Sequence, residues 1–324
     1  MTYLQQTESL QSMNVTVIGC GTIGAGWAAT FAAAGHRVKV YDLNPASGER
    51  LANVWLQALP VLQRIGVCVD DPQAPSWTDD LNEALLNTQF IQEALPERLP
   101  LKLEILTQIE EKIADDVLIA SSSSGLSPSQ MQANMRMPQR LLIGHPCNPP
   151  YLMPLVEICG GEQTAPQALD KADAIYQSLG KSVLRLQKEA SGHLVNRLQA
   201  ALWREAVHLA AEGYASVGDI EKAVTQGLGA RWSILGPTAI FHLAGADQGL
   251  AKFLDDLGTE VEKWWSDLGT PELSDEVKQV LINGMDAAAG EETSSAMAAR
   301  RDEQVVAMIE KQQSLQRKQK GSDA

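Results

Sequence analysis

Residues 13–42, MNVTVIGCGTIGAGWAATFAAAGHRVKVYD, decide the fold because they contain a strand, a helix and a second strand in that order. A β-branched apolar run leads into a glycine turn and an alanine-rich helix that ends at Gly35. The second strand extends from Val38 to Asp42. Small residues along the helix allow it to pack closely on its strands. The stretch therefore predicts one complete βαβ unit.

The turn between the first strand and the helix has the spacing GxGxxG. In this position Gly19 permits a tight turn, Gly21 lets the backbone approach a pyrophosphate, and Gly24 brings helix and strand together. The start of the helix also offers unpaired N–H groups to phosphates. We expect a dinucleotide site here, and the alternative is a turn that only packs the helix on the strand. The cofactor contacts expected from this loop are Gly19, Gly21, Thr22, Ile23 and Gly24.

Asp42 closes the second strand and bears on the choice of dinucleotide. A carboxylate in this place accepts hydrogen bonds from the adenosine ribose and repels a 2′-phosphate. The sequence therefore predicts NAD, rather than NADP, as the cofactor.

The rest of the chain falls into two patterns. Further strands at TQFIQEA, DVLIASS and QRLLIGHP alternate with helices, one of them from Leu101 to about Ile113, which predicts a parallel sheet covered on both faces. From about Ser191 the apolar residues recur at helical spacing. We predict an α/β protein, with a Rossmann-type doubly wound parallel sheet followed by an all-α domain. The expected boundaries are residues 1–190 for the NAD-binding domain, 191–312 for the helical substrate and dimerisation domain, and 313–324 for a flexible tail.

Composition excludes several classes of partner. The net charge of −14 repels phosphate backbones, and no basic run is interleaved with aromatic residues, so nucleic acid is not expected to bind. No stretch approaches the roughly 18 uninterrupted apolar residues of a membrane span, and the first dozen residues lack the features of an export signal. The four cysteines have neither CxxC nor metal-ligand spacing, which suits a reducing compartment. We expect a cytoplasmic protein without metal, membrane or nucleic-acid partners.

The stretch LLIGHPCNPPYLMPLVEICGG, residues 141–161, places His145 at the end of an expected strand. Glu157 follows after an extended, proline-rich segment that can bend back. A carboxylate at one ring nitrogen would fix the tautomer and raise the basicity of the other nitrogen, which makes a general base. The alternative is a core histidine whose ring is satisfied by backbone groups.

Several segments together resemble the 3-hydroxyacyl-CoA dehydrogenase superfamily over nearly the whole chain: GHPCNPPYLMPLVE, IASSSSGLSPS, QEALPERLPLK and SGHLVNRLQAALWREA. GLGARWSILGPTAIFHLAGADQGLAKFL is most similar to the branch with L-carnitine dehydrogenases and lambda-crystallin-type L-gulonate 3-dehydrogenases. The resemblance implies the following roles: His145 as base, Glu157 as its orienting carboxylate, Ser124 and Asn196 as partners of the substrate oxygen, and Glu97 and Lys102 as holders of the nicotinamide half of NAD.

The sequence departs from the family at pocket positions. Cys147 stands where many relatives carry phenylalanine, SGH replaces a frequent proline-glycine-phenylalanine, and Ser122 replaces a frequent asparagine. These changes concern the substrate rather than the reaction. A nucleophilic role for Cys147 is the alternative to a small pocket-lining residue.

The substrate is expected to be a free hydroxy acid. Only Arg50 and Arg64 stand among acids in the region where a coenzyme A site usually carries lysines. Aromatic rings can enclose a quaternary ammonium group, and an arginine can meet a carboxylate. The residues expected to contact substrate are Cys147, Arg231, Trp232 and Phe253.

The resulting hypothesis is an NAD-dependent L-3-hydroxy acid dehydrogenase that forms a homodimer through its helical domain. L-Carnitine is the first candidate substrate, followed by L-gulonate and a short 3-hydroxyacyl-CoA. A protein of another class, a crystallin-like structural protein that binds NAD without turnover, is the remaining alternative.

Overall fold

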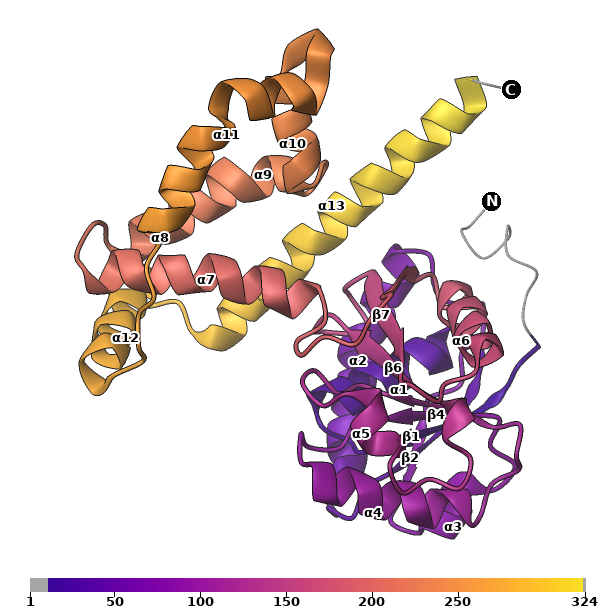
Figure 1. The fold of residues 1–324 in the computed structure, drawn as a ribbon. Helices are drawn as coiled ribbons and strands as arrows, with labels where there is room; N and C mark the ends of the chain where they lie inside the picture. The colour runs from indigo at the N-terminus through magenta and orange to yellow at the C-terminus, as the bar shows by residue number, and fades with distance from the viewer. Residues whose placement is uncertain (1–10, 323–324) are drawn as a thin grey trace. The chain divides into compact units, whose positions relative to one another are not determined.

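The computed structural model describes residues 11–322, which divide into two compact units (Figure 1). The first unit comprises the described residues up to Arg197 together with those from Ala298 onwards. The second unit comprises Leu198–Met297. The first unit is therefore built from two stretches of chain that are far apart in the sequence.

One sheet of eight strands forms the centre of the first unit, in the order β3-β2-β1-β4-β5-β6-β7-β8. Every neighbouring pair from β3 across to β6 is parallel, as predicted. The strands are β1 (Asn14–Ile18), β2 (Arg37–Tyr41), β3 (Ser76–Thr78), β4 (Phe90–Glu93), β5 (Leu118–Ser121), β6 (Leu141–Pro146), β7 (Leu155–Gly160) and β8 (Ser182–Arg185).

The far edge of the sheet departs from the parallel arrangement expected from the sequence. Strand β7 is antiparallel to β6, and β8 is parallel to β7. The physical reason is the short proline-rich connection after β6, because a parallel neighbour would need a long crossover, whereas a short connection returns the chain in the opposite direction.

Helices cover both faces of the sheet, which confirms the doubly wound fold (Figure 1). Val17 and Ile18, adjacent in β1, belong to different apolar clusters because successive strand residues point to opposite faces. One cluster includes side chains of α1, α2 and α6, and the other includes side chains of α3, α4 and α5. The helices are α1 (Thr22–Ala33), α2 (Ser47–Arg64), α3 (Leu81–Leu85), α4 (Leu99–Glu110), α5 (Pro128–Gln132), the 3-10 helix η2 (Pro138–Arg140) and α6 (Pro166–Ser178).

The second unit is all-helical within its described residues, as predicted. Helix α7 (Val195–Ala211) leads into it, and helix α13 (Ser294–Ser322) leads out of it. No helix within residues 11–322 combines the length and the apolar character that crossing a membrane requires. The other elements of the second unit are α8 (Val217–Lys222), the π-helix η3 (Ala223–Gly229), α9 (Ala230–Trp232), α10 (Pro237–Ala244), the 3-10 helix η4 (Ala246–Gln248), α11 (Gly249–Asp267) and α12 (Asp275–Ala289).

The C-terminal segment differs from the expected domain boundaries. Residues from 313 onwards, expected to form a flexible tail, continue helix α13 as far as Ser322, and the last two residues lie outside the described range. The sequence there is polar but rich in good helix formers. Val306 and Ile309 are buried in the apolar cluster that contains α1 and α2, and Gln313 donates a hydrogen bond to the Ile65 carbonyl at 3.0 Å. Helix α13 thus completes the first unit rather than the second.

Candidate active site

The glycine turn between β1 and α1 leaves room for a ligand close to the protein backbone. Gly19 adopts φ +98°, a conformation that favours glycine, and a Cβ at Gly24 would lie 1.9 Å from the Gly19 carbonyl oxygen. A Cβ at Gly21, in contrast, would have no neighbour within 4 Å. Gly21 therefore leaves open the space that a pyrophosphate needs, and Thr22 and Ile23 open the helix beside it.

Asp42 follows β2 directly and connects it to the glycine turn. Its Oδ2 accepts the Cys20 N–H at 2.7 Å, and its Oδ1 accepts the Asn44 N–H at 2.8 Å. Arg50 donates to the Cys20 carbonyl oxygen at 3.2 Å. Two backbone donors thus hold the Asp42 carboxylate beside the glycine turn.

His145 and Glu157 lie opposite each other on β6 and β7. The His145 Nδ1 is 2.9 Å from the Glu157 Oε2, and both side chains are buried. The other carboxylate oxygen accepts the N–H groups of Leu194 at 2.8 Å and Val195 at 3.1 Å. Because an ionised carboxylate only accepts, Nδ1 carries the hydrogen and Nε2 keeps a lone pair. This tautomer is the one that a general base at Nε2 requires.

The pKa of the His145 imidazole reflects opposing influences. Burial lowers this pKa, while the hydrogen bond and the negative charge of Glu157 raise it, and the net result is a pKa below the ordinary value. The ring is therefore neutral, and able to accept a proton, at neutral pH.

Asn196 in helix α7 and Ser124 in the loop after β5 lie near this dyad. Asn196, at the start of α7, places its Nδ2 3.5 Å from the His145 Nε2. Ser124 is exposed in the loop after β5, and its carbonyl oxygen accepts the Gly192 N–H at 2.9 Å. The amide of Asn196 thus lies beside the basic nitrogen of His145. Ser124 is hydrogen-bonded to the turn that precedes Asn196.

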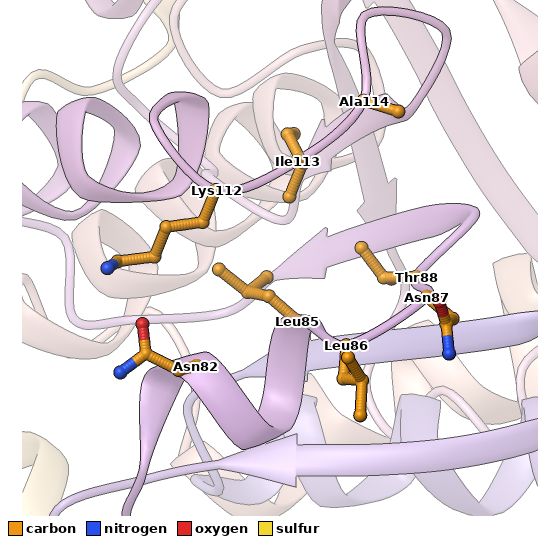
Figure 2. Close-up of a pocket in the computed structure, with 8 residues that line it drawn as sticks. All are labelled: Asn82, Leu85, Leu86, Asn87, Thr88, Lys112, Ile113 and Ala114. Carbon is orange, nitrogen blue, oxygen red and sulfur yellow. The ribbon is translucent and has the colours of Figure 1, made fainter.

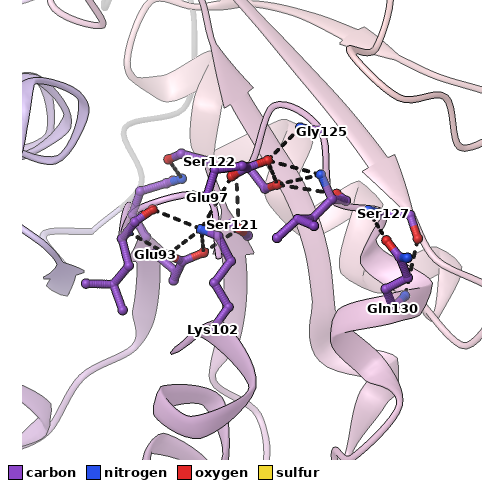
Figure 3. A network of polar contacts seen from close by, with 12 residues as sticks. Glu93, Glu97, Lys102, Ser121, Ser122, Gly125, Ser127 and Gln130 are labelled. Atoms are coloured by element: carbon purple, nitrogen blue, oxygen red, sulfur yellow. Dashed lines mark hydrogen bonds and ion pairs between the residues drawn. The ribbon is translucent and has the colours of Figure 1, made fainter. Parts of the chain in front are cut away.

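Glu97 holds together the loop between β5 and α5, residues 122–127, which we call the serine loop (Figure 3). Its Oε1 accepts hydrogen bonds from the Ser123 hydroxyl at 2.6 Å, the Gly125 N–H at 2.6 Å and the Leu126 N–H at 3.0 Å. Burial raises the pKa of the Glu97 carboxyl, but these hydrogen bonds outweigh it, so the pKa is lowered and the group is ionised.

Lys102 has a different environment from the one expected. Its Nζ donates to both Glu93 oxygens, at 2.7 and 2.8 Å, and to the Leu95 carbonyl at 3.1 Å (Figure 3). An ammonium group has three hydrogens, so these acceptors occupy its donors. Its distance to the Glu97 Oε2 is 3.9 Å, and the Ser121 hydroxyl also donates to Glu93. The buried Lys102 thus joins α4 to the end of β4.

The family model "3-hydroxyacyl-CoA dehydrogenase, NAD binding domain" matches residues 14–190, and the corresponding C-terminal domain model matches residues 192–282. The chain belongs to the 3-hydroxyacyl-CoA dehydrogenase family. It is an NAD-dependent dehydrogenase, as predicted.

Relatives of this dehydrogenase are similar over nearly their full length. The chain is 39% identical to the L-carnitine dehydrogenase of Nocardiopsis dassonvillei, over 98% of this chain and 97% of that protein. It is 40% identical to the L-carnitine dehydrogenase of Streptomyces coelicolor, over 91% of this chain and 93% of that protein. Among solved structures, 5-formyl-3-hydroxy-2-methylpyridine 4-carboxylic acid 5-dehydrogenase, an NAD+ dependent dismutase, is 28% identical with a TM-score of 0.79, over 94% of this chain and 99% of that one.

The dehydrogenase keeps Cys147 as a protonated thiol. Burial and the nearby negative charge of Glu157 both raise the pKa of this thiol. Because the thiolate is the nucleophilic form, these surroundings favour the pocket-lining interpretation over a nucleophilic one.

The other three expected substrate contacts lie in the second unit of the dehydrogenase. Phe253 is 7% exposed and stacks on Phe241 with ring centroids 4.7 Å apart, so it packs α10 against α11. Trp232 is half-buried and Arg231 is exposed, both in the short helix α9. The side chains of Trp232 and Arg231 are therefore accessible in part or in full, whereas the contacts of Phe253 are those of a core residue.

A surface cavity of about 380 Å³ lies at the amino ends of the sheet strands of the dehydrogenase (Figure 2). Thr88 precedes β4 and Ala114 precedes β5, so the cavity is at the amino ends of these strands, whereas His145 lies near the carboxyl end of β6. Ligands of doubly wound sheets bind at the carboxyl ends. The cavity is therefore separate from the candidate active site.

Sequence reasoning missed two residues of this site, Glu93 and His193. Glu93 is fully buried beneath the serine loop, and His193 is buried against His145 with ring centroids 4.9 Å apart. A signal for Glu93 existed, since it is an acidic residue within an otherwise strand-like run. The signal for His193 was the replacement of phenylalanine in SGH, although its contact with His145 depends on tertiary structure.

Proposed function

We propose that this dehydrogenase oxidises the 3-hydroxyl group of a small free L-3-hydroxy acid to a ketone, with NAD as acceptor and L-carnitine as the principal substrate. The observation that carries the proposal is the buried His145–Glu157 pair, whose tautomer leaves a basic nitrogen beside Asn196. Relatives named L-carnitine dehydrogenase, similar over nearly the whole chain, support the choice of substrate.

The proposed chemistry assigns one step to each side chain. His145 Nε2 takes the proton of the substrate hydroxyl, and Glu157 stabilises the imidazolium that results. Asn196 and Ser124 hold the oxygen on which charge develops. NAD, when bound, supplies the hydride acceptor.

The residues proposed to hold NAD come from the carboxyl edge of the sheet. The glycine turn and α1 face the pyrophosphate, and Asp42 meets the adenosine ribose. Glu97 approaches the nicotinamide half, while Lys102 supports that region through Glu93 and the Leu95 carbonyl. We thus assign Lys102 an indirect role, because its donors already have acceptors.

The region beyond β2 favours a free acid over a coenzyme A thioester. Arg64 forms ion pairs with Glu303 at 2.6 Å and with Glu310 at 3.1 Å, and Arg50 donates to the Cys20 carbonyl. Both cations of this region are therefore already engaged. A 3-hydroxyacyl-CoA, whose phosphates need cations, is the weaker alternative.

Two further alternatives remain. L-Gulonate is a free acid, but it has no cation that Trp232 could contact, whereas the trimethylammonium group of carnitine would gain about 0.5–2 kcal/mol from such a ring. A crystallin-like protein that binds NAD without turnover would not need a base with a fixed tautomer. The intact dyad therefore favours an enzyme.

We also propose that the protein acts in the cytoplasm as a homodimer formed through its second unit. The four cysteines, Cys20, Cys68, Cys147 and Cys159, are free thiols, which suits a reducing compartment. Large apolar side chains of the second unit are exposed to an extent that a partner surface would relieve. They include Trp203, Tyr214, Leu243, Leu254, Trp264 and Trp265.

Formation of NADH, followed by its absorbance, with L-carnitine, L-gulonate and 3-hydroxybutyryl-CoA tests the proposal. We expect the highest kcat/KM with L-carnitine and loss of turnover in His145→Gln. Trp232→Ala should raise the KM for L-carnitine but not for NAD, whereas Phe253→Ala should mainly reduce stability. A higher kcat/KM for either competing substrate would refute the assignment of L-carnitine, and no turnover with any hydroxy acid would favour the structural alternative.

A further inference from the structure

His193 occupies a tightly constrained turn that precedes Asn196 and is hydrogen-bonded to Ser124. Gly192 has φ +77° and its N–H donates to the Ser124 carbonyl, while His193 itself has φ +50°. Few residues other than glycine adopt such a conformation, and histidine is among those that do so more often. The side chain is 2% exposed. The backbone therefore directs this imidazole into the protein.

The ring of His193 lies against that of the proposed base. The two ring centroids are 4.9 Å apart and the planes are inclined by 47°. The His193 Nε2 is 2.9 Å from the Ser123 carbonyl oxygen, which can only accept, so Nε2 carries the hydrogen. The buried Nδ1 has no hydrogen-bond partner among the described residues. A hydrogen at Nδ1 would therefore lack an acceptor there.

Charged groups approach this pair of imidazoles from several elements. Glu157 on β7 contacts His145 and accepts the N–H groups of Leu194 and Val195, the two residues after His193. Glu97 is bonded to the Ser123 hydroxyl, and Arg197 donates to the Ser191 carbonyl at 3.5 Å. Of these groups, Glu157 contacts the His145 ring directly, whereas the hydrogen-bond partner of the His193 ring is the Ser123 carbonyl.

We propose that His193 is a positioning residue for the base, a second imidazole that shares at most one proton with His145. This inference rests on the proposed function only in that His145 acts as the base. During oxidation the O–H bond of the substrate breaks and an N–H bond forms at His145, while the hydride passes to NAD. A neutral His193 permits that transfer, and a protonated His193 would oppose it because two cations would be in contact.

The electrostatics of the site agree with this geometry. Burial lowers the pKa of His145, Glu157 raises it, and a positive charge on His193 lowers it again. Two groups coupled in this way lose their protons in steps that belong to the pair. The coupling can therefore be measured without any substrate.

The test is an NMR titration of the imidazole rings, which is practical because the chain has five histidines. The His145 midpoint is measured in His193→Gln, the His193 midpoint in His145→Gln, and both midpoints in the unmodified protein. If the rings are coupled, the sum of the two midpoints in the unmodified protein is lower than the sum of the two single-variant midpoints. The expected difference is about one pH unit or more. Equal sums would overturn the proposal.

Two further variants separate charge from structure. His193→Phe loses the hydrogen bond to Ser123, whereas His193→Gln can keep a donor there, and neither carries a charge. Equal His145 midpoints in both variants support coupling by charge, while a shift in His193→Phe alone would show a merely structural role and overturn the proposal. His36→Gln, a buried histidine of the first unit, is the matched control and should move neither midpoint. Failure of L-carnitine as a substrate would leave this titration result intact, so the two proposals are refuted separately.

Discussion

His145 and Glu157 are partners in the register of two antiparallel strands, and their side chains meet at 2.9 Å between Nδ1 and Oε2. The sheet itself, rather than a mobile loop, therefore sets the distance between the imidazole and the carboxylate. Backbone N–H groups at the start of α7 hold the other carboxylate oxygen, so the orientation of the pair is determined from both sides.

Replacement of His145 by glutamine should remove the base and leave the cofactor site intact. We expect turnover to fall by roughly 10²- to 10⁴-fold, the usual contribution of a positioned general base, with little change in NAD affinity. Steady-state kinetics together with a fluorescence titration of NAD measure both quantities. If more than about half of the turnover remained, the base would have to be another residue.

Replacement of Glu157 by glutamine should have a milder effect on turnover and a clear effect on pH dependence. The negative charge of Glu157 raises the pKa of His145, so its loss lowers that pKa and moves the acid limb of kcat/KM for oxidation to lower pH. The amide cannot accept at both ends, so one buried donor loses its partner at a cost of about 1–3 kcal/mol. A pH–rate profile and thermal unfolding check the two effects, and an acid limb that moved to higher pH would contradict the assignment.

Asp42 provides a test of cofactor selectivity. Asp42→Ala should weaken NAD binding and narrow the preference for NAD over NADP, because it removes both the proposed ribose acceptor and the charge that repels a 2′-phosphate. Asp42→Asn is the matched control, since it keeps an acceptor without the charge that repels a 2′-phosphate. The ratio of kcat/KM for the two cofactors is the measurement. Equal use of both cofactors by the unmodified enzyme would be incompatible with this role.

Lys102→Met distinguishes a buried structural lysine from a direct NAD contact. Removal of the ammonium leaves the Glu93 carboxylate buried without its partner, so we expect a loss of about 3–5 kcal/mol in the free energy of unfolding. Lys102→Met combined with Glu93→Gln should recover part of that loss. Urea unfolding measures stability, and a large rise in the KM for NAD with unchanged stability would instead support direct contact.

His36 predicts how stability depends on pH. Burial lowers the pKa of its imidazole from 6.5 to about 4, so between these values the unfolded chain binds a proton that the folded protein does not. The contribution of His36 to the free energy of unfolding is fully present above about pH 6.5. It falls by about 3 kcal/mol as the pH decreases to about 4. Urea unfolding at several pH values should show a shallower decrease in His36→Gln. The same slope in both proteins would rule out His36 as the cause.

The sequence predicted those features that depend on neighbouring residues. The βαβ unit is local, because its strand, glycine turn and helix are consecutive, and the carboxylate Asp42 follows directly. The pairing of His145 with Glu157 was expected from the prolines between them, which allow the chain to bend back. The family resemblance implied a role for Lys102 but did not point to Glu93, its partner in the structure.

The remaining features depend on contacts between distant residues. In the sequence, Lys102 cannot be told from a solvent-exposed lysine on a helix. Only the fold brings it beneath the serine loop to Glu93. Phe253 is one aromatic residue among several, and its stacking on Phe241 requires that α10 and α11 meet. The polar segment after residue 312 carries too few apolar residues to indicate a packed helix, although Val306 and Ile309, earlier in α13, fix its attachment.

The return of α13 to the first unit has a consequence for biosynthesis. The cofactor-binding unit is interrupted after Arg197 and resumes at Ala298, so the ribosome must make the whole second unit before the last segment of the first. Chains grow from the N-terminus, and domains generally fold as units during synthesis. Until α13 emerges, the nascent sheet domain exposes the apolar surface that Val306 and Ile309 later cover. That interval is when a chaperone, or premature association between nascent chains, has its opportunity to act.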